Sequence, residues 1–373
     1  MIQPRRALSD SERRDWLRLI RTEHVGPIAF RILLRRCGDA GAALDALPEM
    51  ARFGGQRGAK PFGRAEADRE MEAVERLGGR MIALCEPDYP PMLAAIEDAP
   101  PVITVLGDAS LLSRPQVGIV GARTASTNGR RFAETLARDL GQEGMVVASG
   151  LARGIDAAAH AGALPTGTVA VVGGGVDAVY PAENRALHER IAAEGAIVAE
   201  QALGVQPKAR HFPRRNRLIS GLSRGIVVVE AALRSGSLIT ARMAAEQGRE
   251  VFAVPGFPGD PRAEGGNRLI REGATLIRSA ADVLEDLAGI GASFAETGGD
   301  YGVDAPDPAE PGALEQARSA VTGRLSPSPT PVDELVRDCQ LSASAVLTAL
   351  LELELAGRIE RQPGNRVALV GTT

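Results

Sequence analysis

Between about Arg80 and Leu287, short runs of β-branched and other apolar residues alternate with segments of helical periodicity. The runs have the length of single strands and are apolar at most positions, which is typical of parallel strands buried on both faces. This alternation predicts a doubly wound, extended Rossmann-like α/β sheet. The expected strands are Val102–Leu106, Val117–Val120, Met145–Ala148, Thr168–Val172, Ala196–Ala199, Gly225–Val229, Val251–Val254 and Thr275–Ile277. The expected helices are about Asn128–Leu140, Gly154–Ala163, Asn184–Ala193, Leu238–Gln247 and Asn267–Arg271.

The segment before the sheet is expected to be helical. In the turn His24-Val25-Gly26-Pro27, the glycine permits a tight bend and the proline suits the first turn of the helix that follows. The pattern predicts a SAM-like or helix-hairpin-helix-like domain over residues 1–76. Such a domain either contacts the DNA backbone or is a plain small helical bundle. Its helices are expected at Trp16–Arg21, Ile28–Arg36, Gly41–Met50 and Ala65–Arg76.

Two further parts are expected after the sheet domain, which we place at residues 77–288. Residues 289–329 are rich in Gly, Ala, Pro, Ser and acids, which predicts a flexible linker with a short helix at Leu314–Val321. Residues 330–373 predict a winged-helix domain. Its elements are expected to be helices at Val332–Asp338 and Ser342–Ala356, and a hairpin at Arg358–Val370 that turns at Pro363-Gly364-Asn365.

The second helix of the expected winged-helix domain is acidic. It contains Glu352 and Glu354 and no basic residue. A helix that reads DNA needs Arg, Lys, Asn or Gln to meet phosphates and base edges. The domain is therefore expected to contact protein or to support the fold rather than to read a DNA sequence.

Composition excludes several classes of protein. No segment approaches about 18 uncharged apolar residues, so no transmembrane helix is predicted. The N-terminus lacks the apolar core of a signal peptide. Cys37, Cys85 and Cys339 lie far apart and form neither a disulfide framework nor a C-x-x-C metal site, which favours a reducing cytoplasm. The net charge of −4 shows that the molecule as a whole is not a polycation.

One stretch of the sheet domain is strongly basic and is expected to be a loop at the edge of the sheet. Between Pro207 and Arg217 there are five basic residues and no acid, and Phe212 lies among them. Such a stretch suits single-stranded nucleic acid, because phosphates meet the cations and a base stacks on the ring. The alternative is a solvated loop whose phenyl ring is tucked into the core. The candidate residues are Lys208, Arg210, Phe212, Arg214, Arg215, Asn216 and Arg217.

Three strand-to-helix junctions share one design, in which small residues follow a strand and precede a helix. In a parallel sheet these junctions gather at the carboxyl ends of the strands, where ligands bind, and the free N–H groups of helix starts favour anions. Arg123 and Arg153 would add charge-assisted hydrogen bonds to phosphate. The predicted anion site comprises Gly121, Arg123 and Ser126 at the first junction, Ser149, Gly150, Arg153 and Gly154 at the second, and Ser235, Gly236 and Ser237 at the third.

Common nucleotide and metal motifs are missing from the sequence. There is no G-x-x-x-x-G-K-[ST], and no G-x-G-x-x-G follows the first strand, so no cofactor is expected. The histidines have no metal-ligand spacing with cysteines or acids, so no metal is expected. Asp156 and His160 are four residues apart on one helix and form a possible acid–base pair. Such a pair more often braces a loop.

These residues lie in segments that resemble the DNA-processing protein A family (DprA, also called Smf). The similar segments occur in order over nearly all of residues 117–277. They are VGIVGARTAS, ASGLARGIDAAAHAGAL, TVAVVGGGVDAVYPAEN, the run from HFPRRNRLISG to EVFAVPG, and GGNRLIREGA. The resemblance implies a Rossmann domain that binds single-stranded DNA, forms a homodimer and loads the RecA recombinase during natural transformation or recombination.

The resemblance also implies which residues bind DNA. The residues that match the family's single-stranded DNA pocket are Arg123, Arg153 and Phe212. A basic residue just ahead of the aromatic contributes in relatives, for which Lys208 and Arg210 are both candidates. This sequence has Ala where serine is common just before Arg123, and Arg153 where lysine is common, so a hydroxyl contact is lost and a charge is kept.

Three functions remain open on the sequence. The main hypothesis is a non-catalytic, single-stranded DNA-binding recombination mediator. The alternative is a Rossmann-like nucleotide-binding enzyme similar to nucleoside monophosphate hydrolases, with Glu230 or Asp156 as the acid and SGSLITA as an anion loop. A duplex-binding regulator that uses the winged helix is the third, and the acidic second helix argues against it.

Overall fold

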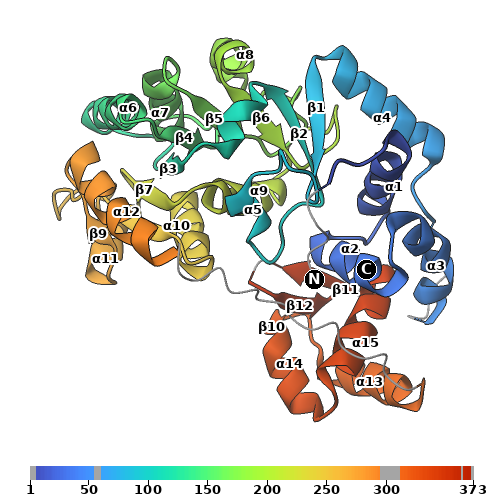
Figure 1. Ribbon diagram of the computed structural model, residues 1–373. Helices are drawn as coiled ribbons and strands as arrows, with labels where there is room; N and C mark the ends of the chain where they lie inside the picture. Colours follow the sequence, from blue (N-terminus) through green and yellow to red (C-terminus); the bar gives the residue numbers. More distant parts are fainter. Residues whose placement is uncertain (1–5, 54–59, 295–310, 363, 371–373) are drawn as a thin grey trace. The chain divides into compact units, whose positions relative to one another are not determined.

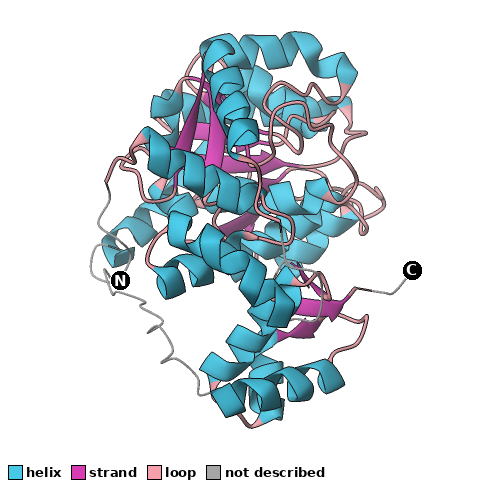
Figure 2. Cartoon of the chain, turned by 90° about the vertical axis from the view of Figure 1, so that its right-hand side faces the viewer, coloured by secondary structure: helices cyan, strands magenta, loops and turns pink. Residues whose placement is uncertain are grey.

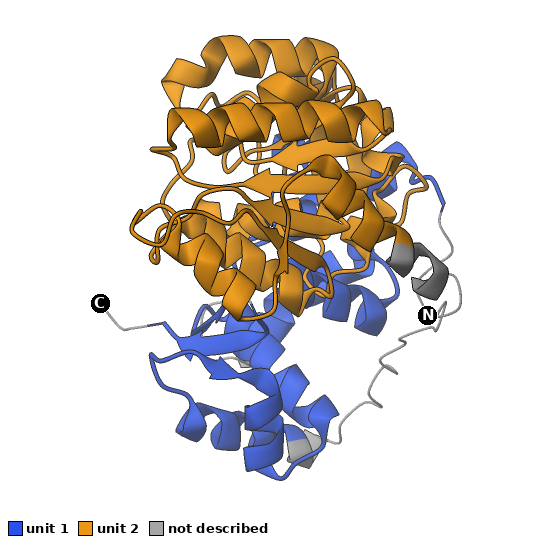
Figure 3. Cartoon of the chain, turned by 90° about the vertical axis from the view of Figure 1, so that its left-hand side faces the viewer, with its two compact units in different colours: residues 1–71, 301–373 blue, residues 72–300 orange. Residues whose placement is uncertain are grey.

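A computed structural model of the protein describes residues 6–53, 60–294, 311–362 and 364–370 (Figure 1). The chain forms two compact units, residues 1–71 together with 301–373, and residues 72–300 (Figure 3). The larger unit contains a nine-stranded sheet, and Figure 2 shows its strands between layers of helices. Within the described residues, no helix has the length and apolar character needed to cross a membrane.

The sheet of the larger unit has the strand order β1-β2-β6-β5-β4-β3-β7-β8-β9. From β6 to β9 all neighbouring strands are parallel. The strand bounds are β1 Gly79–Ala83, β2 Val102–Gly107, β3 Gln116–Val120, β4 Val146–Ser149, β5 Thr168–Val171, β6 Ala196–Ala199, β7 Gly225–Val228, β8 Glu250–Ala253 and β9 Thr275–Leu276. The expected doubly wound, Rossmann-like sheet is confirmed, and β1 is an addition that the sequence analysis did not predict.

One predicted strand direction is wrong. β2 was expected to be parallel, but it pairs antiparallel with β6, with Thr104 opposite Ala199, and β1 pairs antiparallel with β2. The link between β1 and β2 contains only the short helix α5 (Pro91–Ala94), whereas the connection between parallel neighbours is usually a longer helix that crosses one face of the sheet. The apolar residues on both faces of β2 therefore indicate that the strand is buried, but they do not determine its direction.

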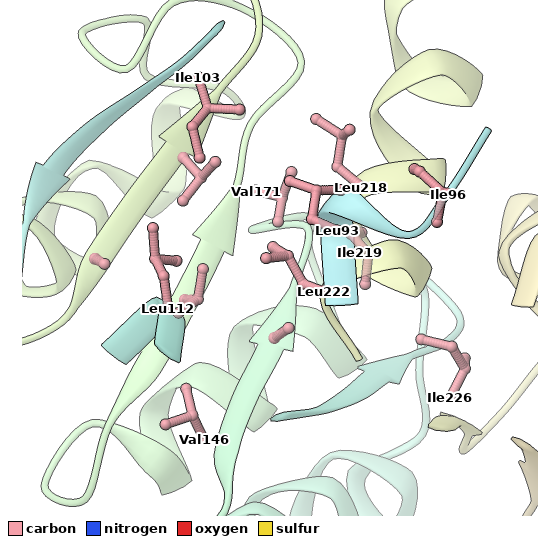
Figure 4. Packing of buried hydrophobic residues seen from close by; sticks show 14 of the residues in the cluster. Leu93, Ile96, Ile103, Leu112, Val146, Val171, Leu218, Ile219, Leu222 and Ile226 are labelled. Carbon is pink, nitrogen blue, oxygen red and sulfur yellow. The ribbon is translucent and has the colours of Figure 1, made fainter. Parts of the chain in front are cut away.

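Helices cover both faces of the sheet. One face carries α6 (Thr127–Gln142), α7 (Ile155–Ala163) and α12 (Ala280–Phe294), whose buried residues include Leu136 and Val283. The other face carries α5, α9 and α10, and Figure 4 shows Leu218 and Leu222 of α9 in the same cluster as Leu93 of α5. The remaining helix bounds are α8 Arg185–Glu194, α9 His211–Leu222, α10 Gly236–Glu246 and α11 Glu264–Arg271.

The basic stretch is a helix over most of its length, which corrects the predicted loop. Only Pro207–Arg210 of this stretch precede α9, and His211 begins it. The reason lies further along the chain, where Leu218, Ile219 and Leu222 are spaced as one helical face and are buried in the core. The residues from Pro207 to Arg217 do not contain this apolar face, which begins at Leu218, so the basic stretch by itself does not predict a helix.

The smaller unit joins the two terminal parts of the chain. Its α15 packs against α13 and also against α2 and α3. Leu351 and Leu355 of α15 are buried although they lie outside the apolar cluster of the winged helix. The bounds are α1 Asp10–Arg21, α2 Pro27–Cys37, α3 Ala40–Phe53, α13 Pro311–Arg324, β10 Thr330–Pro331, α14 Val332–Cys339, α15 Ala343–Leu355, β11 Ile359–Gln362 and β12 Arg366–Leu369, while α4 (Arg64–Arg76) leads into the larger unit.

The predicted linker is partly helical. α12 continues to Phe294, and α13 occupies Pro311–Arg324, so the short helix expected at Leu314–Val321 is confirmed and is longer than expected. Residues 295–310 lie outside the described residues. α13 contributes Ala317 and Val321 to the core of the winged helix, which therefore begins before the predicted residue 330.

Candidate functional site

An open pocket lies where β3, β4 and β5 end, and the start of α9 closes its remaining side. Its empty space is about 440 Å³, including the open mouth. The loops after the three strands and the first turns of α9 all contribute, so residues far apart in the sequence meet here. The pocket is lined by Arg123, Gly150, Ala152, Arg153, Val172, Gly173, Gly174, Ala178, Tyr180, Pro181, Pro207, Phe212 and Arg215.

Aromatic and cationic groups face one another in the wall of the pocket. The guanidinium carbon of Arg123 lies 5.5 Å from the ring centroid of Phe212, a cation–π arrangement. The ring of Tyr180 lies 5.4 Å from that of Phe212 and is tilted by 41°. Phe212 is half-buried and Tyr180 is exposed. The Phe212 ring is thus flanked by a cation and by a second aromatic ring while part of it stays accessible.

Arg153 lines the same pocket from the loop after β4. Its Nε lies 3.5 Å from Oε1 of Glu183, and both side chains are more than half exposed. Exposed ion pairs of this kind contribute little, typically about 0–1 kcal/mol. The guanidinium can therefore exchange Glu183 for a phosphate at small cost.

The floor of the pocket is formed by Gly150 and Arg215. A Cβ added to Gly150 would lie 1.5 Å from Nη1 of Arg215, so a larger residue at this position would force the guanidinium to move. Burial lowers the pKa of Arg215 to about 10, and the charge of Asp156 opposes this shift. Arg215 therefore stays protonated at neutral pH.

Asp156 and His160 do not form an acid–base pair. The Asp156 carboxylate accepts hydrogen bonds from the backbone N–H groups of Gly150 at 3.2 Å and Ala152 at 3.3 Å, which braces the loop after β4. His160 turns to Thr168, with Nδ1 2.7 Å from Oγ1. Since the Thr168 hydroxyl donates to the Val147 carbonyl, Nδ1 of His160 is the donor. Burial raises the pKa of Asp156 and lowers that of His160 to about 3, so the histidine is neutral.

Glu230 closes the crevice between β3 and β7, where the strand order reverses and where ligands of such sheets commonly bind. Its carboxylate accepts from the backbone N–H of Ser126 at 2.8 Å and from the Ser126 hydroxyl at 2.5 Å. The Ser126 hydroxyl in turn accepts from the N–H of Gly129 at 2.9 Å. The N-terminus of α6 is thus satisfied by an internal anion, and the pocket opens one strand further along, over β4 and β5.

The third predicted junction also lies outside the pocket lining. The Ser235 hydroxyl caps α10 by accepting from the N–H of Ser237 at 3.3 Å. Asn216 donates from Nδ2 to the carbonyl of Gly236 at 3.5 Å, which ties α9 to α10. These groups stabilise the start of α10 through contacts within the protein.

Other predicted residues divide between packing and solvent. Gly121 and Gly154 sit where a Cβ would meet backbone or core atoms, and the Ser149 hydroxyl donates to the Ile119 carbonyl. Arg217 is buried, with Nη2 2.6 Å from Oε1 of Glu200. None of these four lines the pocket. Lys208, Arg210 and Arg214 are exposed at and just before the start of α9.

The sequence analysis missed the part of the pocket that follows β5. Tyr180, Pro181 and Gly173–Gly174 line it, and none of them was among the predicted site residues. An exposed tyrosine in a chain with three, placed after a strand of the same sheet, was the available signal. In the described residues, no group of His, Cys, Asp and Glu is arranged to hold a metal ion.

Known protein families match nearly the whole chain. Residues 80–288 match the model for DNA recombination-mediator protein A. Residues 10–73 match a DprA-like N-terminal HHH domain, and residues 305–365 match a DprA winged helix domain. The helical, sheet and winged-helix parts thus each have a counterpart in one family.

Individual relatives extend the match. Protein Smf of Escherichia coli is 40% identical over 315 residues, which cover 83% of this chain and 82% of the relative. The X-ray structure of DNA processing protein A from Streptococcus pneumoniae has a TM-score of 0.63 and 34% identity, covering 75% of this chain and 98% of that one. The Helicobacter pylori structure described for its single-stranded DNA binding mode has a TM-score of 0.52 and 30% identity, covering 57% of this chain and 96% of that one.

Proposed function

Because the chain belongs to the DNA recombination-mediator protein A family, we propose that it binds single-stranded DNA in the pocket at the ends of β3, β4 and β5. The observation that carries the proposal is the approach of the Arg123 guanidinium to the Phe212 ring at 5.5 Å. Phosphate is held by arginines and a base stacks on the ring, the two contacts that single-strand binders combine. The H. pylori relative described for single-stranded DNA binding supports this choice.

An unpaired strand fits the pocket better than a duplex does. The aromatic groups lie in a concave site, with Phe212 half-buried and Tyr180 beside it. A base reaches them only if its flat face is free, and in a duplex that face is stacked on neighbouring bases. Arg153 at the rim, with Lys208 and Arg210 exposed before α9, provides positive charge along which the phosphates of the strand continue.

The finer parts of the proposal extend from the pocket to partners. We propose that the protein acts as a homodimer in the cytoplasm and loads a RecA-type recombinase onto the strand. The family resemblance supports the homodimer and the loading of the recombinase. Light scattering of the purified protein tests the homodimer, and recombinase ATPase activity on single-stranded DNA covered by a single-strand binding protein tests loading. A monomer, or an unchanged lag before ATP hydrolysis begins, would contradict the respective part.

The structure offers no support for the enzymatic alternative. Glu230 is bonded to Ser126, and the Asp156 carboxylate is bonded to two backbone amides. A general acid needs a proton that it can transfer to a substrate within hydrogen-bond reach, and neither carboxylate lines the pocket. Incubation with nucleoside monophosphates, followed by chromatography for free base, tests this reading, and rapid release of base would overturn our proposal.

The decisive experiment compares oligo-dT with a duplex of equal length over a range of salt concentrations. Phe212→Ala should weaken binding to oligo-dT by about 1–3 kcal/mol with an unchanged salt slope, because stacking is lost and charge is kept. Arg123→Glu should weaken binding and flatten the slope by about 0.7 or more, because a phosphate contact is lost. Phe257→Ala is the matched control, since Phe257 is 78% exposed and lies outside the pocket lining.

Two results would count against the pocket. If both pocket variants bind like the wild type, the strand does not use this site. If duplex binds as tightly as oligo-dT across the salt series, charge alone accounts for the affinity and the aromatic groups have no role in it.

A further inference from the structure

Arg215 is a buried cation at the floor of the pocket, and it has no hydrogen-bonded partner among the residues that the structure describes. Its exposed fraction is 7%, and its guanidinium lies directly over Gly150, which also lines the pocket. Its Nε is buried without a hydrogen-bond partner, and within the described part of the chain neither Nη1 nor Nη2 has one. Buried polar groups are nearly always bonded, and an exception in a pocket points to a group that a ligand completes.

The charged neighbours of Arg215 do not satisfy it. Asp156 attracts the guanidinium from a distance, but its carboxylate is bonded to the amides of Gly150 and Ala152 and forms no ion pair with Arg215. Arg123 carries the same charge and repels it. The floor of the pocket therefore presents hydrogen-bond donors, since a guanidinium has no acceptor.

The aromatic walls determine what meets these donors. Phe212 and Arg215 are three residues apart on α9 and so share one side of the helix, and Tyr180 flanks the Phe212 ring. A base whose face lies on Phe212 presents its edge, not its face, to the floor. The floor then reads the hydrogen-bonding pattern of that edge.

Resting on the proposed function, we infer that Arg215 selects the base that enters the pocket and favours bases with a ring carbonyl over adenine. Guanine offers O6 and N7 to a planar fork of donors, and cytosine and thymine offer carbonyl oxygens. Adenine places its N6 amino donor beside N7, so a donor meets a donor. Single-strand binding remains tolerant of sequence outside the pocket, because only the inserted base is read.

The test compares oligonucleotides that differ at one ring position. Full-length protein is titrated at fixed salt with oligo-dT, with oligo-dA, and with oligo-dA in which alternate adenines are replaced by hypoxanthine, each about 16 nucleotides long to fill a site. Hypoxanthine exchanges the amino group for a carbonyl and keeps the purine stacking. The wild type should bind the hypoxanthine strand at least about 5-fold more tightly than oligo-dA, the lower end expected for one bidentate contact.

Variants assign the preference to the guanidinium. Arg215→Lys keeps the charge and loses the planar fork, and it should bind both purine strands equally. Arg242→Lys makes the same exchange on an exposed side chain of α10, outside the pocket lining, and should keep the preference. Circular dichroism and the thermal midpoint establish whether Arg215→Lys is folded, and if it is not, the wild-type comparison alone decides.

The outcomes separate this inference from the function on which it rests. Equal wild-type affinity for the two purine strands, or a preference that persists in folded Arg215→Lys, overturns the inference and leaves single-strand binding intact. A wild type that does not bind even oligo-dT removes the proposed function itself.

Discussion

Two arginines on α9 show how differently one side-chain type is used. Arg215 is buried at the floor of the pocket and has no hydrogen-bonded partner in the described part of the chain. Arg217, two residues later, is buried on another side of the helix, where it is bonded to Glu200 and to the Asp98 carbonyl. The donors of the first are those that we propose for a base, and the second uses its donors to join α9 to the segments that contain Asp98 and Glu200.

Arg217→Met should therefore destabilise the fold and spare DNA binding. Removal of one partner of a buried ion pair leaves Glu200 uncompensated and costs about 3–5 kcal/mol. The side chain of Arg217 is 6% exposed and that of Glu200 15%. Urea unfolding measures the loss, and oligo-dT titration of the folded variant should match the wild type. A lower affinity of the folded Arg217→Met variant for oligo-dT would show that Arg217 belongs to the binding site.

His160 should make stability depend on pH. Its pKa falls from 6.5 to about 3 in the folded state, so the unfolded chain binds the extra proton between these values. The free energy of unfolding due to His160 is thus fully present above about pH 6.5 and decreases as pH falls toward 3, by up to about 1.4 kcal/mol per pH unit. Urea unfolding between pH 7 and 5 should show a flatter pH dependence for His160→Asn than for the wild type.

At the scale of elements, α6 begins on an anion that the protein supplies. The Glu230 carboxylate accepts hydrogen bonds from the N–H and the hydroxyl of Ser126. The Ser126 hydroxyl caps α6 by accepting a hydrogen bond from the N–H of Gly129. An acid at a helix N-terminus is stabilising through the hydrogen bonds and the helix dipole. This use of Glu230 explains why the crevice at β3 and β7 is not the pocket.

Glu230→Ala should cost about 0.5–2 kcal/mol, the range for loss of an N-terminal cap. Its matched control is Glu246→Ala, which removes an exposed acid at the end of α10 and should stay within about 0.5 kcal/mol. Thermal unfolding of the two variants gives the comparison. If Glu230→Ala instead abolished single-strand binding and kept stability, the crevice would be part of the functional site.

Prediction of elements from the sequence succeeded where local pattern determined the outcome. The two-sided apolar runs located eight strands to within a residue or two, and Ser342 caps α15 as its sequence context suggests. The direction of β2 could not be predicted, because direction depends on the connection rather than on the strand. α9 was not predicted because its apolar face begins at Leu218, after the basic residues that were interpreted as a loop.

The residues predicted for the site differ in where the structure places them. Arg123 and Phe212 lie together in the pocket, and their role in binding stays a prediction. Three serines were expected to face an anionic ligand: Ser126, Ser235 and Ser237. The sequence does not reveal that Glu230 accepts a hydrogen bond from the first, or that the hydroxyls of the two serines at the start of α10 bond each other. Tyr180 lies in a segment that resembles the family, but nothing in the sequence was a reason to assign it a role in the pocket.

At the scale of the whole molecule, α15 connects the two terminal parts of the chain. α15 follows α14 as the second helix of the winged helix, the position that enters DNA in helix-turn-helix proteins. Here it packs against α2 and α3, and Glu354 lies beside Gly26 of the predicted hairpin turn. This packing, together with the buried Glu352 and Glu354, argues against duplex reading by the intact terminal unit.

Leu351→Asp in the full chain should loosen the smaller unit alone. Leu351 is fully buried outside the winged-helix cluster, and a buried unpaired charge is strongly destabilising. Limited proteolysis should cut the smaller unit faster, while oligo-dT affinity stays at the wild-type value. Ala343→Asp, exposed in the first turn of α15 where an acid is tolerated, is the control. Equal proteolysis of the two variants would show that α15 does not hold this unit together.

The packing of α15 on α3 also has a consequence during synthesis. The N-terminal helices leave the ribosome first, yet part of their apolar surface is covered by a helix made about 300 residues later. At about 5–20 residues per second, that surface stays uncovered for roughly 15–60 s. The nascent chain must therefore keep its first helices from aggregating until its final segment emerges. A ribosome that stalls late in the message leaves the apolar surface of these helices exposed.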